Sequence, residues 1–446
     1  MSNFTVFGLP QAAGEPYNTV NSTTAAATTA VDCCVSMFHE ILAAEQPVSN
    51  ETSRWENEQI ERFCGNNRHR WTPDMCRAYH FGPEITSVTS PLYGYVSPFL
   101  SLVTLIVNTL VCVVLCKKHM RTSTNIVLAA MATADLLTGV CPTPMFVYVH
   151  TLGYARDWPS CSVVQLYNVF SIYLPTIFHT ASIWLTVMLA AQRYIVMRGT
   201  VPQQTNGCVT VNKIIVCIVV IYALAIASQT TTFIDYRYEP TTLPSLLQRG
   251  HMTSGCLQVR TLLTSTNEDL YFTIYWTSRT LLVHVIPCVA LVTFTWFLVM
   301  TIRASNKRRR QNCNVCPGSA QENDAKRTNM MLVAVVVIFL AVELPLAAIY
   351  VHVVLEGLNI IGDDITIHHT NAFAITNNFI LLSYNVNFII YCAMSRQFRQ
   401  TFLAVFKTNS DDDDDVRPAG RRGRCTSMTT DGNGRPTTVN ETTTMV

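Results

Sequence analysis

Seven long stretches with almost no charge are the feature that most constrains how this chain can fold. A bilayer core is about 30 Å thick, so a helix needs ~20 mostly apolar residues to cross it. Stretches of this kind lie at residues 92–116, 125–149, 161–197, 212–234, 271–302, 328–355 and 370–394. A backbone in lipid must satisfy its own hydrogen bonds, and the alternating pattern of barrel strands is absent. Each stretch is therefore expected to be a helix.

The composition excludes an ordinary soluble enzyme. Charged residues make up 13 % of the 446 residues, whereas a soluble globular chain carries about 25 %. The buried core of a soluble helical protein could explain one such stretch, but not seven. We therefore predict an all-α membrane protein built as a seven-transmembrane helix bundle. The net charge of +2 gives no general reason to expect nucleic-acid binding.

The basic residues beside the spans predict the orientation, because Lys and Arg concentrate in cytoplasmic loops. After spans one, three and five the loops and their flanks hold twelve such residues: Lys117, Lys118, Arg121, Arg198, Lys213, Arg303, Lys307, Arg308, Arg309, Arg310, Lys326 and Arg327. After spans two, four and six they hold four: Arg156, Arg237, Arg249 and Arg260. We therefore expect the N-terminus outside the cell and the C-terminus in the cytoplasm.

The N-terminal segment, residues 1–91, carries a second sign of orientation. N-glycosylation acceptors, which are used only on the lumenal side, occur at Asn3, Asn21 and Asn50. They lie in the segment that the basic residues already place outside. The sequence thus predicts a glycosylated extracellular segment, followed by a membrane domain over 92–394 in the plasma membrane.

Two further parts are expected on the cytoplasmic side. Residues 395–407 read as an amphipathic helix on the membrane surface, with Phe398, Phe402 and Val405 on one face. Residues 408–446 read as a disordered tail with an acidic run and a Thr-rich end. Its hydroxyl groups are candidates for phosphorylation and arrestin-like partners. The final Thr444-Met445-Val446 fits a PDZ domain, although such short matches often arise by chance.

The cysteines agree with this topology. Cys161 and Cys256 are the only cysteines of the predicted extracellular loops, and that compartment is oxidising, so we expect them to form a disulfide. The alternative is two free thiols. The pairing of the N-terminal cysteines stays open: Cys33, Cys34, Cys64 and Cys76. The Cys313-Asn-Val-Cys316 motif lacks a second ligand pair, so no metal site is expected there.

Four ionisable groups interrupt the spans: Asp135, Arg193, Arg279 and Glu343. Such a group costs at least ~2.5–3.5 kcal/mol at the middle of a membrane, so each is a candidate for function. Arg279 lies about eight residues into span five, ~12 Å from its outer end. It either reaches an extracellular cavity or snorkels to the headgroups.

Asp135 is the candidate centre of a polar pocket. Other spans offer polar groups that can converge on it: Asn108, Ser182, Ser383 and Asn387. A carboxylate among such groups can hold a cation, and sodium is the candidate. The alternative is an interhelical hydrogen-bond network without an ion.

Span three and span six each carry a polar feature that a moving helix could use. His179, Ser182, Thr186 and Arg193 recur at offsets that place them on one stripe of span three. Taken alone, Arg193 is explained by the enrichment of basic residues at the cytoplasmic ends of spans. Glu343 lies two residues before Pro345, where proline makes a kink point. It either changes partner as the helix moves or makes a fixed structural hydrogen bond.

Several motifs, and their order along the seven predicted helices, resemble those of rhodopsin-like G-protein-coupled receptors. They are Asn108, Asp135, Gln192-Arg193-Tyr194, Pro345 and Asn387-Phe-Ile-Ile-Tyr391. Further segments resemble one invertebrate branch, the sex peptide/myoinhibitory peptide receptors and the myosuppressin and FMRFamide-type receptors. They are His179-Thr-Ala-Ser-Ile-Trp-Leu-Thr186, Val342-Glu-Leu-Pro345 and Cys392-Ala-Met-Ser-Arg-Gln-Phe-Arg399.

The resemblance implies a neuropeptide receptor, with short C-terminally amidated peptides as the expected class of ligand. It implies coupling to a heterotrimeric G protein through a switch made of Gln192, Arg193, Tyr194, Phe339, Glu343, Pro345, Asn387 and Tyr391. The ligand-pocket candidates are Gln165, His179, Tyr275, Arg279 and Glu343. Extracellular acids that could meet an arginine of the peptide are Asp235, Glu239, Asp363 and Asp364.

Two alternatives stay open. A secondary transporter could use Asp135 and Glu343 as coupling carboxylates, although no inverted repeat is visible. A decoy receptor that binds peptide without signalling is suggested by Gln192 and Thr295, which stand where the family usually has an acid and a tyrosine. An enzyme is not expected, because no set of nucleophile and base stands out.

Overall fold

The computed structural model describes most of the chain from the first span to the helix after the last. The described residues are 58, 61, 88–154, 157–197, 207–245, 251–261, 268–311, 320–358, 360–361, 366–406, 429–430 and 436–437. Several predictions concern residues outside these ranges: Asn3, Asn21, Asn50, Cys33, Cys34, Cys64, Cys76, Cys313, Cys316, Asp363, Asp364 and Thr444–Val446.

Seven helices in the described part are long and apolar enough to cross a membrane, which confirms the predicted bundle. They are Thr89–Leu115, Ser123–Thr151, Cys161–Val196, Val211–Ile234, Thr273–Ala304, Asn329–Glu356 and Thr370–Met394. Each begins and ends within a few residues of the predicted stretch. The third is the longest, with 36 residues.

Four of the spans are built from helical pieces joined end to end. Span one consists of α3 (Thr89–Pro91), η1 (Leu92–Val96) and α4 (Ser97–Leu115). Span two consists of α5 (Ser123–Val140), α6 (Thr143–Phe146) and η3 (Val147–Thr151), after the short turn η2 (Lys118–Met120). Span three consists of α7 (Cys161–Tyr167), η4 (Asn168–Tyr173) and α8 (Leu174–Met197). Span five consists of α11 (Glu268–Arg279), η5 (Thr280–Val285) and α12 (Ile286–Gln311).

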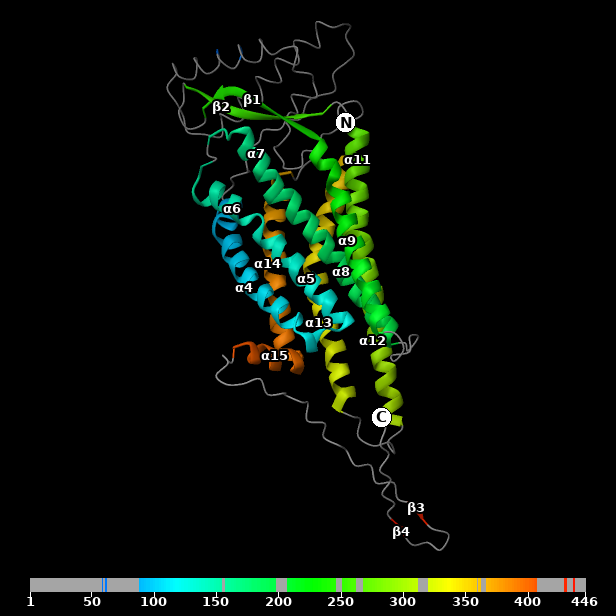
Figure 1. Ribbon diagram of the computed structural model, residues 1–446. Coiled ribbons are helices and arrows are strands. Elements are labelled where there is room, and N and C mark those ends of the chain that lie inside the picture. Colours follow the sequence, from blue (N-terminus) through cyan, green and yellow to red (C-terminus); the bar gives the residue numbers. More distant parts are fainter. Residues whose placement is uncertain are drawn as a thin grey trace. The chain divides into compact units, whose positions relative to one another are not determined.

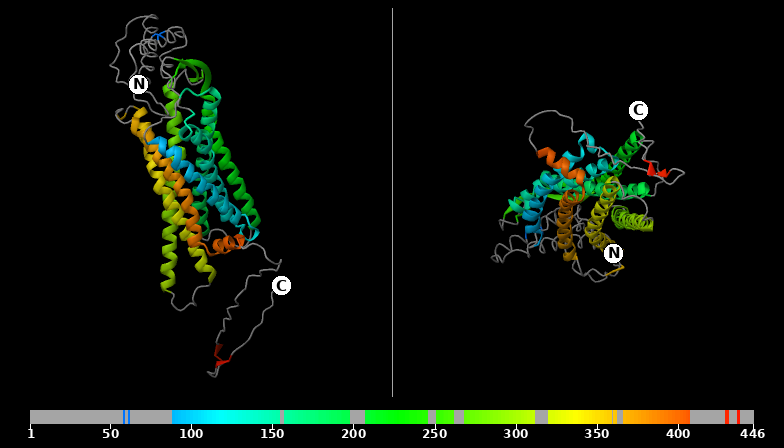
Figure 2. Two further views of the ribbon diagram at one scale, coloured as in Figure 1. Left: turned by 90° about the vertical axis from the view of Figure 1, so that its left-hand side faces the viewer. Right: turned by 90° about the horizontal axis from the view of Figure 1, so that it is seen from below.

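The other three spans are single helices. They are α9 (Gly207–Ile234), α13 (Ala320–Gly357) and α14 (Thr366–Met394). Figures 1 and 2 show all these helices running side by side along the bundle.

The segments η1, η3, η4 and η5 are π-helical, which the sequence analysis did not predict. Proline gives a physical reason for three of them. Pro98, Pro175 and Pro287 lack an N–H, so each leaves the carbonyl four residues earlier without its α-helical donor. Those carbonyls, at Gly94, Ser171 and Val283, lie inside η1, η4 and η5. The hydroxyl of Thr151 donates to the Gly94 carbonyl across 2.6 Å.

A β-hairpin connects spans four and five. Strand β1 (Tyr236–Pro244) pairs antiparallel with β2 (Met252–Arg260), from Tyr236 opposite Arg260 to Pro244 opposite Met252. Figure 1 shows the hairpin across one end of the bundle, next to α7. We call this the hairpin end, and the opposite end, where α8 carries Arg193, the Arg193 end.

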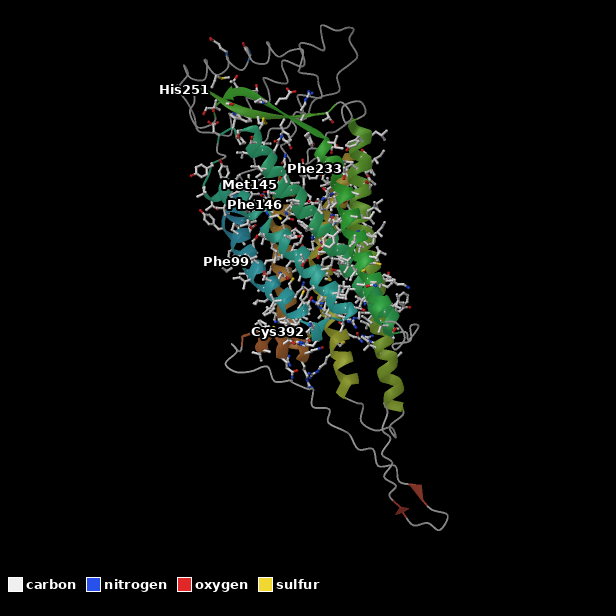
Figure 3. All side chains as sticks on the ribbon, in the orientation of Figure 1. Phe99, Met145, Phe146, Phe233, His251 and Cys392 are labelled. Atoms are coloured by element: carbon white, nitrogen blue, oxygen red, sulfur yellow. A yellow bond between two sulfur atoms is a disulfide. The ribbon has the colours of Figure 1, made fainter. Side chains whose placement is uncertain are left out.

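The bundle is packed with apolar side chains between the helices and also exposes many on the outside. The largest buried cluster lies toward the Arg193 end and includes Val111, Leu128, Leu189, Leu332 and Tyr391. On the outer face, Phe99 is 66 % exposed and points away from α4 (Figure 3). Many other large apolar side chains are exposed as well, more than a soluble protein presents to water, so lipid is the expected solvent of this surface.

Helix α15 (Arg396–Phe406) follows the last span, where the amphipathic helix was expected. Phe398 is buried and its ring lies 5.7 Å from that of Tyr391, while Phe402 lies 5.5 Å from Phe388. The apolar face of α15 thus packs against the end of α14. In the separate unit formed by the tail, β3 (Thr429–Thr430) and β4 (Pro436–Thr437) make a short antiparallel pair.

Candidate functional site

A buried carboxylate lies at the centre of the bundle. Glu343 of α13 is 1 % exposed, and its two oxygens meet two histidines from other elements. His284 Nδ1 in η5 lies 2.6 Å from Glu343 Oε1, and His179 Nε2 in α8 lies 3.4 Å from Glu343 Oε2. A charge inside a membrane bundle needs such partners. The cluster of Glu343, His179 and His284 therefore ties three spans together at one point.

The cluster continues to a fourth span through a tyrosine. His179 Nδ1 lies 2.8 Å from the hydroxyl oxygen of Tyr384 in α14, and Tyr384 is 2 % exposed. Tyr384 also lines the cavity beside Asp135. A polar path thus connects Glu343 to Asp135 through the middle of the bundle.

Asp135 lies beside a small cavity of about 10 Å³. Its lining includes side chains with oxygen atoms from three spans: Asp135, Ser182, Thr186, Ser383 and Asn387. The hydroxyl of Ser182 donates to Asp135 Oδ1 across 2.5 Å. A carboxylate with several neutral oxygens is a donor set that suits a hard cation, and the volume suits one water-sized occupant.

Asn108 is not among the residues that line this cavity. It is buried in α4, but its amide donates to the carbonyl of Thr104 across 3.2 Å. Asn385 of α14 instead makes the contact between spans one and seven, donating to Thr104 Oγ1 across 3.0 Å. Nearer the hairpin end, the hydroxyl of Ser97 donates to Asn378 Oδ1. The spacing of seven residues from Asn378 to Asn385 puts both on one face of α14.

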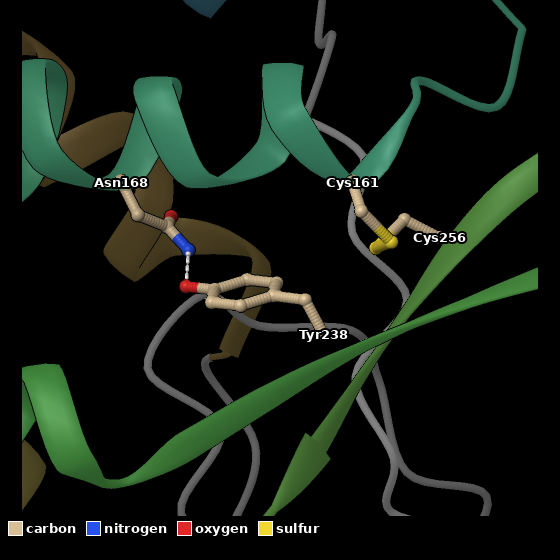
Figure 4. The surroundings of a disulfide bond; sticks show 4 residues. All are labelled: Cys161, Asn168, Tyr238 and Cys256. Carbon is tan, nitrogen blue, oxygen red and sulfur yellow. Dashed lines mark hydrogen bonds between the residues drawn. A yellow bond between two sulfur atoms is a disulfide. The ribbon is translucent and has the colours of Figure 1, made fainter.

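The hairpin is fastened to span three by a disulfide. Cys161 at the start of α7 is bonded to Cys256 of β2, as predicted, with their Cα atoms 4.8 Å apart. Figure 4 shows a second contact beside it, in which the amide of Asn168 donates to the hydroxyl of Tyr238 across 2.7 Å. These contacts hold the hairpin over α7 and η4.

The two described acids near the hairpin already have partners within the chain. Glu239 lies 3.0 Å from Arg237, and Asp235 accepts a hydrogen bond from the hydroxyl of Tyr271. Partial burial, together with this bond to Asp235, raises the pKa of Tyr271 above its usual range. Both acids therefore already take part in contacts within the chain.

Arg279 lies between aromatic rings on the inner face of span five. Its guanidinium carbon is 5.9 Å from the ring centres of both Trp276 and Tyr350, and Nη1 donates to the hydroxyl of Tyr275 across 3.3 Å. Tyr350 also stacks on His284 with the ring centres 4.4 Å apart. Arg279 and Tyr275 are therefore connected to Glu343 through Tyr350 and His284. Gln165, on α7, is exposed and lies outside these contacts.

The residues of the expected switch lie on three helices, α8, α13 and α14. Arg193 Nε is buried and has no hydrogen-bond partner among the described residues, and the same holds for Gln192 Oε1. Tyr194 packs its ring 5.5 Å from that of Phe297. Phe339 lines the cavity beside Asp135. Pro345 lies inside α13, which continues through it.

Four residues of this network were not predicted from the sequence: His284, Tyr384, Tyr350 and Trp276. A signal existed for His284, because a histidine near the middle of an apolar span needs a polar partner. For the three aromatic residues there was none, since an aromatic ring in a span most often packs against lipid or apolar neighbours. Among the described residues, no group of three or more His, Cys, Asp or Glu side chains could hold a metal ion.

The fold and this network define a multi-pass membrane protein with a polar centre that joins its spans. Residues 95–409 match the family described as serpentine type 7TM GPCR chemoreceptor Srw. The chain belongs to this family and is therefore a G-protein-coupled receptor rather than an enzyme or a transporter.

Known proteins with related sequences include receptors for peptides. The chain is 36 % identical to the sex peptide receptor of Drosophila melanogaster over 323 residues, 71 % of this chain and 72 % of that protein. It is 32 % identical to sex peptide receptor-related protein 2 of Caenorhabditis elegans over 332 residues, 71 % of each chain. It is 24 % identical to human neuropeptide FF receptor 1 over 333 residues, 72 % of this chain and 71 % of that protein.

Proposed function

We propose that this receptor lies in the plasma membrane with its N-terminus outside and binds an extracellular neuropeptide at the hairpin end. The excess of Lys and Arg in the odd-numbered loops supports this orientation. The names of the related receptors support a peptide as ligand. A short amidated peptide is the ligand class that we favour, and the Arg193 end is then the side that meets a heterotrimeric G protein.

The contact of Glu343 with His179 and His284 is the observation that carries the proposed mechanism. It ties span six to spans three and five at a point two residues before Pro345, where a helix bends most easily. A ligand that binds one arrangement of the spans more tightly shifts the population toward that arrangement. We therefore assign to Glu343, Pro345 and Phe339 the pivot at which span six moves.

The same proposal gives roles to the other switch residues. At the Arg193 end, opening of span six exposes Arg193 and Tyr391 to the G protein, with Gln192, Tyr194 and Asn387 beside them. In the middle, the cavity beside Asp135 takes a sodium ion held by Asp135, Ser182 and Ser383. An ion there favours whichever arrangement keeps its oxygen ligands together. Arrestin-like and PDZ partners of the tail stay predictions from the sequence.

Cells that express the full chain with an extracellular tag provide the test. Amidated neuropeptides are applied, and G-protein activation is compared between the wild type and Arg193→Ala. We expect a peptide that activates the wild type, with its potency or maximal response lowered at least about tenfold in Arg193→Ala, because a charged contact is lost. Lys213→Ala, on the exposed face of α9, is the control and is expected to respond like the wild type.

Surface expression of each variant is measured through the tag, so that a folding defect is separated from a signalling defect. Peptide binding without G-protein activation by the wild type would support the decoy alternative instead. An unchanged response of Arg193→Ala at equal surface expression would remove Arg193 from the proposed switch.

A further inference from the structure

Three buried polar atoms lie on one face of span five and have no hydrogen-bond partner among the described residues. They are Trp276 Nε1, Arg279 Nε and Thr280 Oγ1. Their positions, i, i+3 and i+4, place them together on a helix. Trp276 is 8 % and Thr280 3 % exposed, and residues on other faces, such as Leu281 and Leu282, are exposed. The face therefore looks into the bundle rather than toward lipid.

The side chain of Arg279 lacks an acidic partner in the described part of the chain. The ion pairs found there connect other residues. Its charge is compensated by the rings of Trp276 and Tyr350, which each lie 5.9 Å from the guanidinium carbon. The side chain as a whole is partly exposed, so it is not sealed by its neighbours.

The chemistry of this face selects one kind of ligand group. An indole N–H and a guanidinium can only donate hydrogen bonds, and a hydroxyl can also donate. A buried donor without a partner is costly, so a group that accepts from these atoms gains binding free energy. A carbonyl or carboxylate oxygen accepts, whereas an ammonium group does not. The rings of Trp276, Tyr275 and Tyr350 supply apolar surface for an aromatic neighbour of that group.

We propose that Trp276, Arg279 and Thr280 bind a terminal carboxamide or carboxylate that the ligand carries next to an aromatic ring. This inference rests on the proposed function, which makes the hairpin end the ligand side. Arg279 is then the residue that determines specificity. Occupation of the site acts on Tyr350, which contacts Arg279 and stacks on His284, the partner of Glu343.

Three small probes of one shape test the proposal on the full-length receptor in lipid nanodiscs. They are 3-phenylpropanamide, 3-phenylpropanoate and 3-phenylpropylamine, and their affinities are measured by ligand-observed NMR. We expect the amide or the carboxylate to bind at least about tenfold more tightly than the amine. Whichever of these two probes binds more tightly shows whether the acceptor group is a carboxamide or a carboxylate. Arg279→Gln is expected to reduce that preference at least about tenfold.

Arg303→Gln is the matched control, because Arg303 is an exposed arginine further along the same span. If Arg279→Gln does not fold, Trp276→Phe keeps a ring, removes one donor and is expected to weaken acceptor binding about threefold to tenfold. Equal binding of the amine, no binding of any probe up to its solubility limit, or an unchanged preference in both variants overturns the proposal. These measurements involve neither a peptide nor a G protein. Their outcome can therefore be interpreted even if the proposed function is wrong.

Discussion

At the scale of single residues, the most informative side chain is Glu343. A carboxylate at this depth is expensive unless neighbouring groups stabilise it. Here two histidines from different spans do so, at 2.6 Å and 3.4 Å. Two polar contacts therefore join span six to spans three and five at this depth. Either contact can be lost when span six moves, which is what a switch requires.

Glu343→Gln is the first prediction at this scale. Glutamine keeps the size of the side chain but removes the charge, so its contacts with His179 and His284 weaken. Because those contacts tie spans three, five and six, we expect G-protein activation without ligand to rise several-fold. The dependence of basal signalling on external pH is expected to change as well, since the histidines lose their charged partner. Both are measured in cells at matched surface expression.

Glu356→Gln is the matched control for that prediction. Glu356 lies on the same helix but meets His352 one turn away, within α13. This contact lies within one helix, so we expect its loss to leave basal activity and its pH profile as in the wild type. If Glu343→Gln behaves like this control, the switch role of Glu343 is wrong.

At the scale of helices and strands, the sequence predicts most of what is observed. Each span follows from the length of an apolar stretch, because lipid forces the backbone into helices. The π-helical segments do not follow from that argument, and three of the four contain a carbonyl that a single proline deprives of its α-helical donor. Asp135, Ser182 and Glu343 could be found as polar residues in apolar spans. Their partners could not, because the rotation of each helix is set by packing against the others.

The crossing of spans one, two and seven gives a prediction about packing. A Cβ added at Gly139 would lie 3.1 Å from Leu381 Cδ2 and 3.4 Å from Thr104 Cγ2. The hydroxyl of Ser101 also donates to the Gly139 carbonyl across 2.8 Å, which keeps the helices close. We expect Gly139→Val to lower the free energy of unfolding by roughly 1–3 kcal/mol, because overpacking forces neighbours apart.

Thermal unfolding of the purified protein in detergent measures this effect, with Ala223→Val as the control. Ala223 is exposed on α9, where an added methyl group meets only lipid or detergent. The control is expected to unfold at the temperature of the wild type and Gly139→Val a few degrees lower. Equal unfolding temperatures would mean that the helices have room to separate at this crossing.

At the scale of the whole molecule, the solvent explains the pattern of exposure. Span four is the clearest case, since Val216, Val219 and Leu224 on α9 are each more than half exposed. In water such a surface would drive aggregation. In a bilayer it has no such cost, and only the polar groups between helices need partners. The receptor can therefore hold its centre together with a few polar contacts while its outer surface stays apolar.

The odd number of spans leads to a last prediction. The seven spans of the described residues predict that the two ends of the chain lie on opposite sides of the membrane, and the basic loops predict an outside N-terminus. We expect antibodies to detect an N-terminal tag on intact cells and a C-terminal tag only after permeabilisation. We also expect glycosidase treatment to shift the wild type on a gel but not a variant with Asn3, Asn21 and Asn50 changed to Gln. Detection of both tags on intact cells would contradict the proposed orientation and, with it, the assignment of the hairpin end to the ligand.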